Sequence, residues 1–426
     1  ALGSVLIGVT LAFGAAWFVE RTDMPLKTTV RTMMYSWMAV PPIVLAFGWI
    51  LLANPGNGII NVILRAVLGI KGAPVSIYSM GAMIAITGLA IVPTAFTMIA
   101  GLLRNMDPQL ESAGSVHGAT GFGVFRTVTL PLLVPGLLSV GILLFMAMVQ
   151  AFDLPLVIGL TAKVPVLSTQ IFLLANSDIS RPDYSLTATF GTFFLVLALV
   201  LMLIYFRAVR FGERFRVVTG KAFRPSLRSL GPWKSAVLAA IAIYFTIMLL
   251  PLLVLIWTSF LPFYAVPSMA ALERLTIQNY YAVFHESQIL IWLIVLAHVT
   301  AYIAFGTRTM YAAILQIHKE LESAAFICGA GWFTMLRRII FPLLLPHILN
   351  GWLWVAGHSA RDITFPLFLI TFTNVVVASQ LYVLWNTPEI PTAAALSIVL
   401  VGGLLAFVVP VQIYASSLER GKVPKK

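Results

Sequence analysis

Long apolar runs recur along this 426-residue chain, and short loops that hold most of its charges separate them. A helix needs about 20 apolar residues to cross a bilayer. Hydrophobic residues make up 60% of the chain and charged residues only 10%, whereas a soluble domain carries roughly 25% charged residues. So few charges cannot cover the surface of a soluble protein of this size. The sequence therefore predicts an all-α polytopic membrane protein.

The apolar runs that are long enough to span a membrane define the predicted helices. They are Ala1–Val19, Met33–Ala53, Ser76–Leu103, Leu132–Phe152, Ser185–Phe206, Ser235–Phe260, Ile289–Tyr311, Leu343–Ala360 and Thr392–Ala415. Two further apolar stretches, 154–174 and 366–384, are interpreted as broken segments at the outer face, because proline, glycine and lysine interrupt the first and the second is its counterpart. Irregular backbone at membrane depth must be satisfied by protein or by a watery cavity.

The net charge of +12 is concentrated in the short loops. Residues 207–234 hold eight Lys and Arg against one acid, Glu213, and the final residues 420–426 are also basic. This bias is typical of loops on the cytoplasmic side, and so we expect the linker and the C-terminus there. An anionic-lipid-binding linker is the alternative, and it indicates the same side. No basic groove with interleaved aromatics is present, which argues against a nucleic-acid partner.

The chain contains an internal repeat. Residues 110–133 and 321–344 are identical at 11 of 24 positions without a gap, at an offset of 211 residues. Pro155 and Pro366 match at the same offset. Because the span count places both copies in cytoplasmic loops, we predict parallel halves related by an axis along the membrane normal. The predicted organisation is a first transmembrane half over 1–206, a basic linker over 207–234 and a second half over 235–426.

The span count also indicates segments that this sequence lacks. When the predicted spans are counted back from the cytoplasmic linker, residue 1 falls on the outer side of the membrane. We therefore expect at least one earlier span. Two predicted spans precede Ser76–Leu103, but only one precedes its equivalent, Ile289–Tyr311. We therefore expect that two helices are missing near the join Gln288–Ile289.

Each copy of the repeat predicts a short helix, over 108–117 and over 319–328. An acidic first turn suits the helix dipole, and Gly118 and Gly329 are placed to end the helices. Small residues on one face of each predicted helix leave room for another backbone to approach closely. Two interpretations remain: a helix displayed for a partner, and an amphipathic helix resting on lipid. The presence of two gapless copies in equivalent loops favours docking.

These segments resemble the EAA loop of permease subunits of bacterial binding-protein-dependent ABC importers, which has Glu-Ala-Ala, then a glycine, then a hydrophobic-Leu-Pro end. The residues that match are Glu111, Ser112, Ala113, Gly114, Gly118 and Arg126 in the first copy, and Glu322, Ser323, Ala324, Ala325, Gly329 and Arg337 in the second. When the copies are aligned on the glycine, the usual Glu falls on Ser112 and Ser323, and an acid stands one position earlier. Which acid contacts the partner is therefore open. Two fused halves resemble the ferric-iron transport permeases.

The resemblance implies the type I ABC importer fold, with alternating access driven by two cytoplasmic ATPase subunits that dock on the repeated segments as coupling helices. A periplasmic binding protein would deliver the solute to this inner-membrane permease. Ferric iron is the first substrate expected, and polyamine, thiamine, phosphonate or another small anion are the alternatives. ATP and Mg²⁺ would bind the partner subunits, because Gly220-Lys221 and Gly421-Lys422 lack the remainder of a phosphate loop. The chain itself is expected to be no enzyme and to bind no cofactor.

Ionisable residues inside spans are costly and often functional. Arg361 and Asp362 lie ~30 Å along the helix from Pro342, near its outer end, and Asp153 is similarly placed in the first half. Together with His358, these residues are candidates for the substrate pathway or gate, and the alternative is a local structural pair or an interface anchor. His298 has the same two interpretations, a ligand or a helix–helix hydrogen-bond partner.

Two other classes of protein are disfavoured. An ion-driven secondary transporter needs acidic or unwound ion sites in mid-span, which are scarce here. A membrane-embedded enzyme needs a convergent acid/base or metal constellation, and none is apparent. With a single cysteine, Cys328, and no Cys/His spacing typical of zinc, we predict no metal site.

Overall fold

The computed structural model describes residues 1–104, 106, 111, 120–175, 183–213, 227–285, 292–314, 325, 327, 329, 331–369, 376–387 and 389–419. These residues are helical almost throughout, as the apolar runs predict. They fall into two compact units. The first comprises residues 1–38 and 42–255, and the second comprises residues 39–41 and 256–426.

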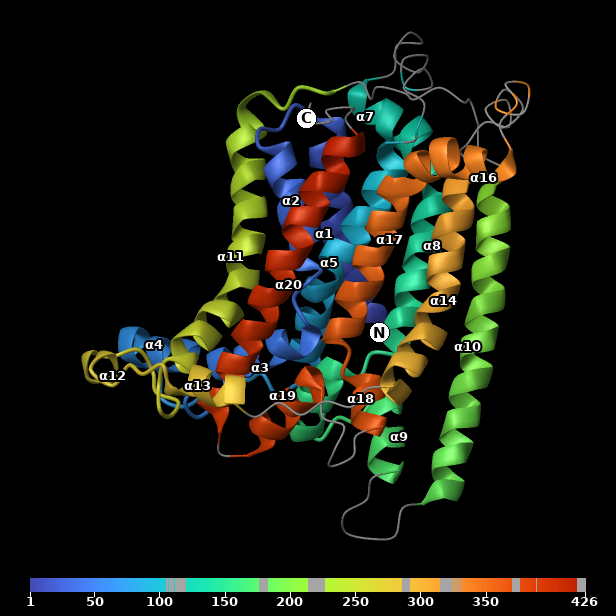
Figure 1. Cartoon of the computed structure of the whole chain (residues 1–426). Helices are drawn as coiled ribbons and strands as arrows, with labels where there is room; N and C mark the ends of the chain where they lie inside the picture. Colours follow the sequence, from blue (N-terminus) through green and yellow to red (C-terminus); the bar gives the residue numbers. More distant parts are fainter. Residues whose placement is uncertain are drawn as a thin grey trace. The chain divides into compact units, whose positions relative to one another are not determined.

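The first unit is built around α1 (Leu2–Arg21), which packs along α5 (Met80–Arg104) (Figure 1). Its other helices are α2 (Lys27–Trp37), α3 (Pro42–Ala53), α4 (Ile59–Leu68), α7 (Gly121–Val124), α8 (Leu130–Val149), α9 (Leu167–Ala175), α10 (Tyr184–Glu213) and most of α11 (Lys234–Ser259). Small residues allow α1 and α5 to approach closely: a Cβ at Gly88 would lie 3.0 Å from Cβ of Ile7. Gly8 of α1 is equally close to α5, because a Cβ there would lie 2.4 Å from Cγ1 of Ile91. Such small-residue seams are the usual means of packing helices in an apolar solvent.

The second unit contains α12 (Met269–Leu272), α13 (Gln278–His285), α14 (Trp292–Ile314), α16 (Trp332–Met335), α17 (Phe341–Arg361), α18 (Thr364–Leu369), α19 (Val377–Asn386) and α20 (Ile390–Glu419). Within it, α17 packs against both α14 and α20, and α13 and α19 pack against α20. Burial of α17 against its two neighbours positions the residues at its end, Arg361 and Asp362.

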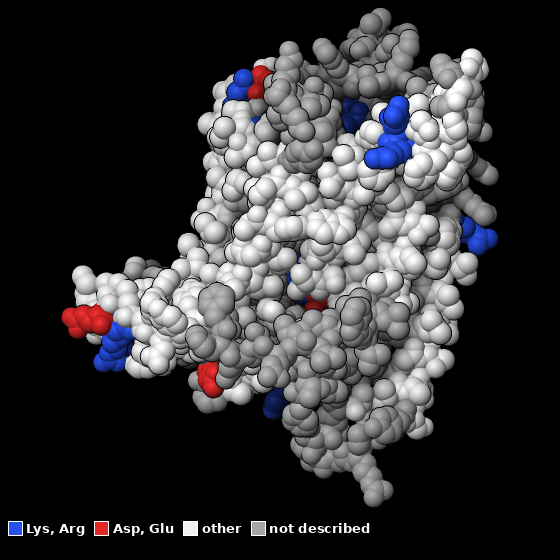
Figure 2. Space-filling view, in the orientation of Figure 1, with Lys and Arg blue, Asp and Glu red and all other residues white. Residues whose placement is uncertain are grey.

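Among the described residues, seven helical segments are long and apolar enough to cross a membrane. They are Leu2–Arg21, Met80–Arg104, Phe125–Val149, Ser185–Arg207, Gly231–Ser259, Trp332–Leu367 and Ile390–Ile413. Each overlaps a predicted run. The described part of the predicted run Ile289–Tyr311 is also helical, in α14 from Trp292 onward, but it carries polar residues such as His298 and is not one of the seven. In Figure 2 most of the visible described surface is uncharged, as expected for helices that face lipid.

The predicted span over Met33–Ala53 is formed by a bent pair of helices. The structure has two helices there, α2 and α3, bent by 95° at the intervening break. Pro41 and Pro42 follow one another at this break. Proline lacks an N–H for the helical ladder and also disfavours the α conformation of the residue before it. The two prolines therefore end α2 and allow α3 to begin in a new direction.

The two broken segments are confirmed as short helical pieces. In the first unit they are η2, a π-helix at Pro155–Gly159, followed by α9. In the second unit they are α18 and α19. The proposed join near 288–289 falls at residues 286–291, outside the described residues.

The repeat in sequence is matched by a repeat in backbone geometry. In the first copy α7 continues through η1, a π-helix at Phe125–Thr129, into α8. In the second copy α16 continues through η4, a π-helix at Leu336–Ile340, into α17. All these starting positions correspond at the offset of 211 residues.

The prolines of the repeat lie directly after the two π-helices. Pro131 and Pro342 occupy the first turn of α8 and α17 and offer no N–H to the preceding turn. The N–H of Leu130 reaches back five residues to the carbonyl of Phe125, and the N–H of Phe341 does the same to Leu336. This i→i−5 pattern defines the π-turn. The repeated proline therefore accompanies the same local widening of the helix in both copies.

The packing units do not end where the predicted repeat halves end. Helix α10 continues through the predicted start of the linker to Glu213, and α11 belongs to the first unit up to Leu255. Close contacts hold α11 there: the hydroxyl of Tyr244 donates to the carbonyl of Leu89 at 3.2 Å. A Cβ at Gly48 would lie 2.6 Å from Cβ of Pro251. The first long helix after the linker thus packs with the elements that precede the linker.

Candidate functional site

The first repeated segment is attached to its neighbours through Glu111. This residue is only 6% exposed. Its Oε2 lies 3.4 Å from Nη1 of Arg21, the last residue of α1. Its Oε1 accepts a hydrogen bond of 2.7 Å from Oγ1 of Thr129, the last residue of the π-helix η1. One carboxylate therefore joins the segment to the helix before it and to the helix after it.

Arg21 is enclosed almost completely, with 1% of its surface exposed. Its Nε and Nη2 have no hydrogen-bond partner within the described part of the chain. A buried charge without a partner is strongly unfavourable. The carboxylate of Glu111 is thus the group that makes this buried guanidinium tolerable.

A second buried carboxylate, Glu20, ties the same end of α1 to two other helices. Its two oxygens accept from Nε and Nη2 of Arg31 in α2, at 2.9 and 2.6 Å. Nε of Arg104, the last residue of α5, lies 3.4 Å from Oε1. The fork-to-fork geometry with Arg31 is the strong form of such a pair. The end of α1 is therefore braced by ion pairs on two adjacent residues, Glu20 and Arg21.

The last residues of the linker are bound to this same end through their backbone. The N–H of Arg228 donates to the carbonyl of Arg21 at 2.9 Å, and the carbonyl of Arg228 accepts from the N–H of Asp23 at 3.0 Å. The guanidinium of Arg228 lies 5.9 Å from the ring centre of Trp17 in α1, within range of a cation–π contact. The linker thus returns to α1 before α11 begins.

Asp23 completes this attachment with its side chain. Its carboxylate lies 2.7 Å from Nζ of Lys234 and accepts from the N–H of Leu230 at 2.8 Å. The hydrogen bond from Lys234, followed by that from Leu230, lowers the pKa of Asp23 from 3.8 to about 2. The carboxylate is therefore charged at any physiological pH. We call the residues Asp23, Arg228, Leu230 and Lys234 the linker clip.

Most of the predicted docking residues lie outside the described residues. These are Ser112, Ala113, Gly114, Gly118, Glu322, Ser323 and Ala324. Of the others, Ala325 is buried, and Arg126 and Arg337 are exposed at equivalent places in the two π-helices. Gly329 has φ of +78°, a conformation that residues with a side chain rarely adopt. The short helix that Gly329 is predicted to end lies largely outside the described residues.

The predicted pathway residues of the second half lie where α17 ends and α18 begins. Nη2 of Arg361 lies 2.7 Å from Nε2 of His358. A guanidinium can only donate, and so Nε2 of His358 accepts. Nδ1 of His358 lies 2.8 Å from the carbonyl of Trp354, which can only accept. His358 is therefore a neutral imidazole with its proton on Nδ1, and both ring nitrogens are occupied by protein.

Asp362 has two structural contacts. Its carboxylate accepts from the backbone N–H of Thr364 at 3.2 Å and of Phe365 at 3.4 Å, and so it caps α18. Its Oδ2 also lies 3.2 Å from Nε2 of His298 in α14. Asp153, by contrast, lies in the first unit, partly buried at the helical turn that precedes η2. The structure thus joins Asp362 to His298, whereas Arg361 joins His358.

Aromatic rings surround these polar groups. Trp354 stacks on His358 with ring centres 3.8 Å apart and on Phe305 at 3.6 Å. Tyr302 meets Trp354 edge-on at 5.7 Å. At the offset of 211 residues, His298 and Asp362 correspond to Thr87 and Ala151. This cluster therefore belongs to the second repeat alone, and comparison of the two repeats is the sequence signal that could have revealed it.

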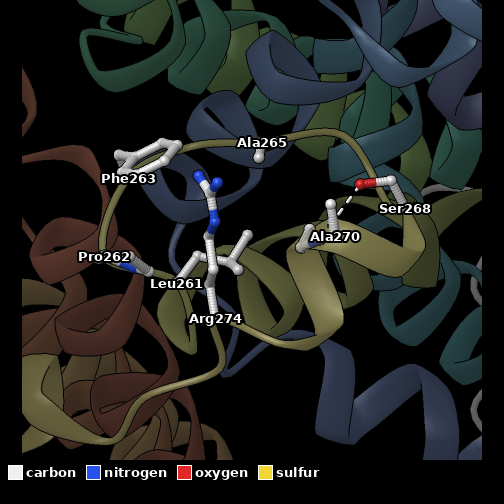
Figure 3. A pocket seen from close by; sticks show the side chains of 8 residues that line it. Leu261, Pro262, Phe263, Ala265, Ser268, Ala270 and Arg274 are labelled. Carbon is white, nitrogen blue, oxygen red and sulfur yellow. Dashed lines mark hydrogen bonds between the residues drawn. The ribbon is translucent and has the colours of Figure 1, made fainter.

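A small pocket lies between the end of α11 and α12 (Figure 3). It has a volume of about 110 Å³, and its lining comprises Leu261, Pro262, Phe263, Ala265, Ser268, Ala270, Ala271 and Arg274. The guanidinium of Arg274 lies 5.6 Å from the ring centre of Phe263. Beside it, Met269 at the start of α12 is 81% exposed. The pocket lining is therefore mostly apolar and includes one cation, Arg274.

Comparison with known proteins identifies the family. The model of the family described as "Binding-protein-dependent transport system inner membrane component" matches residues 4–214 and 228–415. Among curated relatives, the chain is 26% identical over 226 residues to the ferric transport system permease protein FbpB of Actinobacillus pleuropneumoniae, covering 52% of this chain and 32% of that protein. The match therefore spans about a third of that relative's length.

Two other relatives are named for the transport of different solutes. The chain is 30% identical over 118 residues to the spermidine/putrescine transport system permease protein PotC of Haemophilus influenzae, covering 28% of this chain and 46% of that protein. It is 30% identical over 140 residues to the molybdenum transport system permease protein ModB of the same organism, covering 33% of this chain and 58% of that protein.

The family model covers both repeats, with a gap that falls within the linker. The seven apolar helices agree with a multi-pass membrane protein. The chain therefore belongs to the family of inner-membrane components of binding-protein-dependent transport systems, the permease subunits of ABC importers.

Proposed function

We propose that this chain acts as a fused, two-half permease whose repeated segments dock two cytoplasmic ATPase subunits, while a periplasmic binding protein delivers the solute. The observation that carries this proposal is the duplicated segment, each copy of which leads through a π-turn into a long apolar helix. Two equivalent docking segments in one chain suit a partner that has two copies of the same binding site. ATP and Mg²⁺ would bind on that partner, and the two halves would alternate between inward-facing and outward-facing states.

Docking can be tested at the second segment. Because Gly329 has φ of +78°, Gly329→Val should strain the backbone at the end of the short helix. We expect the variant to reach the membrane at wild-type level but to co-purify with less ATPase. Gly331→Ala is the matched control, because φ there is −68° and a Cβ would meet no atom within 4 Å. Full ATPase binding and wild-type stimulation of ATP hydrolysis in Gly329→Val would reject the docking role.

The substrate proposed is ferric iron. The ferric transport relatives, at 26% identity, support it, and relatives named for polyamine and molybdenum transport define the alternatives. The test is ATP-dependent uptake into cells that express this chain with its ATPase and binding protein, using ⁵⁵Fe(III), labelled spermidine and labelled molybdate in parallel. Uptake of ⁵⁵Fe alone is expected. Uptake of spermidine or molybdate in its place would reassign the substrate, and uptake without ATP would reject the ABC mechanism.

The orientation proposed places the linker and the C-terminus in the cytoplasm and the pocket of Figure 3 outside. The basic residues of 207–234 support it. The pocket loop, with its exposed Met269, would then be available to the binding protein. In a Cys328→Ser background, a cysteine at Ala270 should react with an impermeant maleimide in intact spheroplasts, and one at Gly220 only after permeabilisation. The opposite labelling pattern would invert the topology.

A further inference from the structure

We propose that Arg21, Glu111 and Thr129 form a lock that sets the position of the first docking segment, and that Glu111 acts on transport through this lock instead of touching an ATPase subunit. The inference rests on the proposed function of the segment as a docking site. It assigns a role to the displaced acid, which stands one position before the place where the family pattern has its glutamate.

Both carboxylate oxygens of Glu111 have partners within the chain, and the side chain is buried. Oε1 is taken by Thr129 at 2.7 Å and Oε2 by Arg21 at 3.4 Å. The three residues are 6%, 0% and 1% exposed, in the order Glu111, Thr129, Arg21. A docking contact to another protein would require this carboxylate to leave a buried ion pair and strand the guanidinium. The next residue, Ser112, stands at the position where the family pattern has its glutamate.

The two partners of Glu111 lie at the ends of two different helices. Arg21 ends α1, and Thr129 ends η1 directly before α8 begins. Both helices are among the segments able to cross a membrane. The carbonyl of Arg21 also accepts the N–H of Arg228 in the linker clip. A displacement of the segment at Glu111 is therefore transmitted to two spans and to the start of the second half of the chain.

The second copy of the repeat lacks one residue of the lock. At the offset of 211 residues, Thr129 corresponds to Ile340, the last residue of η4. Isoleucine has no hydroxyl to donate to a carboxylate. For Glu322, the equivalent of Glu111, the sequence therefore offers no hydroxyl at the position that corresponds to Thr129. The two docking segments share a sequence pattern, but only the first has a hydroxyl residue at this position.

The experiment uses the full chain with its ATPase and binding protein in lipid nanodiscs. Thr129→Val removes the hydroxyl while conserving the side-chain shape. Thr129→Ser restores the hydroxyl, and Thr127→Val is the matched control, because Thr127 lies on the same π-helix, is exposed and bonds only locally to the carbonyl of Gly123 at 2.8 Å. Ile340→Thr asks whether the second copy depends on the corresponding position. The readouts are Tm, ATPase subunits bound per chain, and ATP hydrolysis with and without binding protein.

We expect Thr129→Val to retain both ATPase subunits and basal hydrolysis but to lose stimulation by the binding protein by about fivefold or more, the lower range of coupling between sites. Thr129→Ser should recover it, and Thr127→Val and Ile340→Thr should behave as wild type. Glu111→Gln should lose stimulation as Thr129→Val does and also retain the ATPase subunits, but with a lower Tm, because Arg21 loses its counter-charge.

Three results would overturn the lock. Wild-type stimulation in Thr129→Val would show that the hydroxyl does not act in coupling. Loss of bound ATPase in Glu111→Gln, with Thr129→Val unaffected, would make Glu111 a direct contact. A fall in the Tm of Thr129→Val without any change in its stimulation by the binding protein would show that the three residues contribute to stability alone. Absence of ATPase binding by the wild-type chain would instead reject the proposed function and leave the lock without a role in coupling.

Discussion

Arg21 and Glu111 are charged residues enclosed by a largely apolar protein. A buried ion pair gains little net free energy, because the attraction mostly offsets the cost of removing both charges from water. Removing one member is different, since the other charge then remains buried alone. The pair is therefore better understood as a constraint on position than as a source of stability.

A double-mutant comparison tests this view. We expect Glu111→Leu alone to cost about 3–5 kcal/mol, because it strands the guanidinium of Arg21. Arg21→Met combined with Glu111→Leu should cost less than the single substitution. The measurement is the thermal unfolding midpoint in detergent at fixed lipid content. A double variant that loses the sum of the two single effects would contradict the pairing.

Asp23 gives the linker clip a defined dependence on pH. Its pKa falls from 3.8 to about 2 in the folded protein, mainly through the hydrogen bond from Lys234. A carboxyl with a depressed folded pKa contributes stability above its unfolded pKa and loses it as pH falls through the folded value. The clip should therefore be unchanged from pH 7 to about 4 and should open between about 4 and 2.

Hydrogen exchange at the amide of Leu230, corrected for the intrinsic rate at each pH, measures this opening. Protection should fall below pH 4 in the wild type. Asp23→Asn should remove the pH dependence, because the group can no longer titrate. Protection that persists unchanged at pH 2 would show that the backbone contacts of Arg228 hold the clip without the carboxylate.

At the level of elements, the corner between α17 and α18 depends on one carboxylate with two tasks. Asp362 caps α18 and pairs with His298 of α14. We expect Asp362→Ala to lower stability by about 0.5–2 kcal/mol through the cap alone, with the loss of the pair added. His298→Gln should cost less, because the cap remains. Equal effects of the two substitutions on Tm would indicate that the cap contributes nothing.

The helices were predictable from sequence to the extent that their causes are local. The length of each apolar run predicted nearly all the long helices, and interrupting prolines predicted the broken segments. The bend between α2 and α3 was missed although its signal, Pro41-Pro42, stands inside the predicted run. The partners of Glu111 could not be foreseen, because Arg21 lies 90 residues away and such pairing is decided by tertiary packing. The same holds for His298 and Asp362.

At the level of the whole molecule, the chain's two packing units and its two sequence repeats have different boundaries. Helix α11 follows the linker, yet it packs in the first unit up to Leu255. Its fit depends on Gly48 of α3, where a Cβ would lie 2.6 Å from Cβ of Pro251. The first unit therefore includes a helix from beyond the linker, and the linker clip fixes where that helix begins.

Substitution of this glycine tests the arrangement. Gly48→Ala should destabilise the protein by about 1–3 kcal/mol, the usual cost of overpacking. Gly14→Ala in α1 is the control, since a Cβ there meets no atom within 4 Å, and it should be neutral or stabilising by up to about 1 kcal/mol through helix propensity. Denaturant or thermal unfolding in the same detergent measures both. A Gly48→Ala protein as stable as wild type would show that α11 does not pack closely at this position.

The paired π-turns also say something about ancestry. A π-turn inside an α-helix amounts to one residue inserted into a single turn. Both copies carry it at the same offset, five residues long, before the same proline. One insertion in a single-copy ancestor accounts for both, whereas insertion after duplication would need the same event twice at matching positions. The matching π-turns therefore agree with an origin of both halves from one duplicated half.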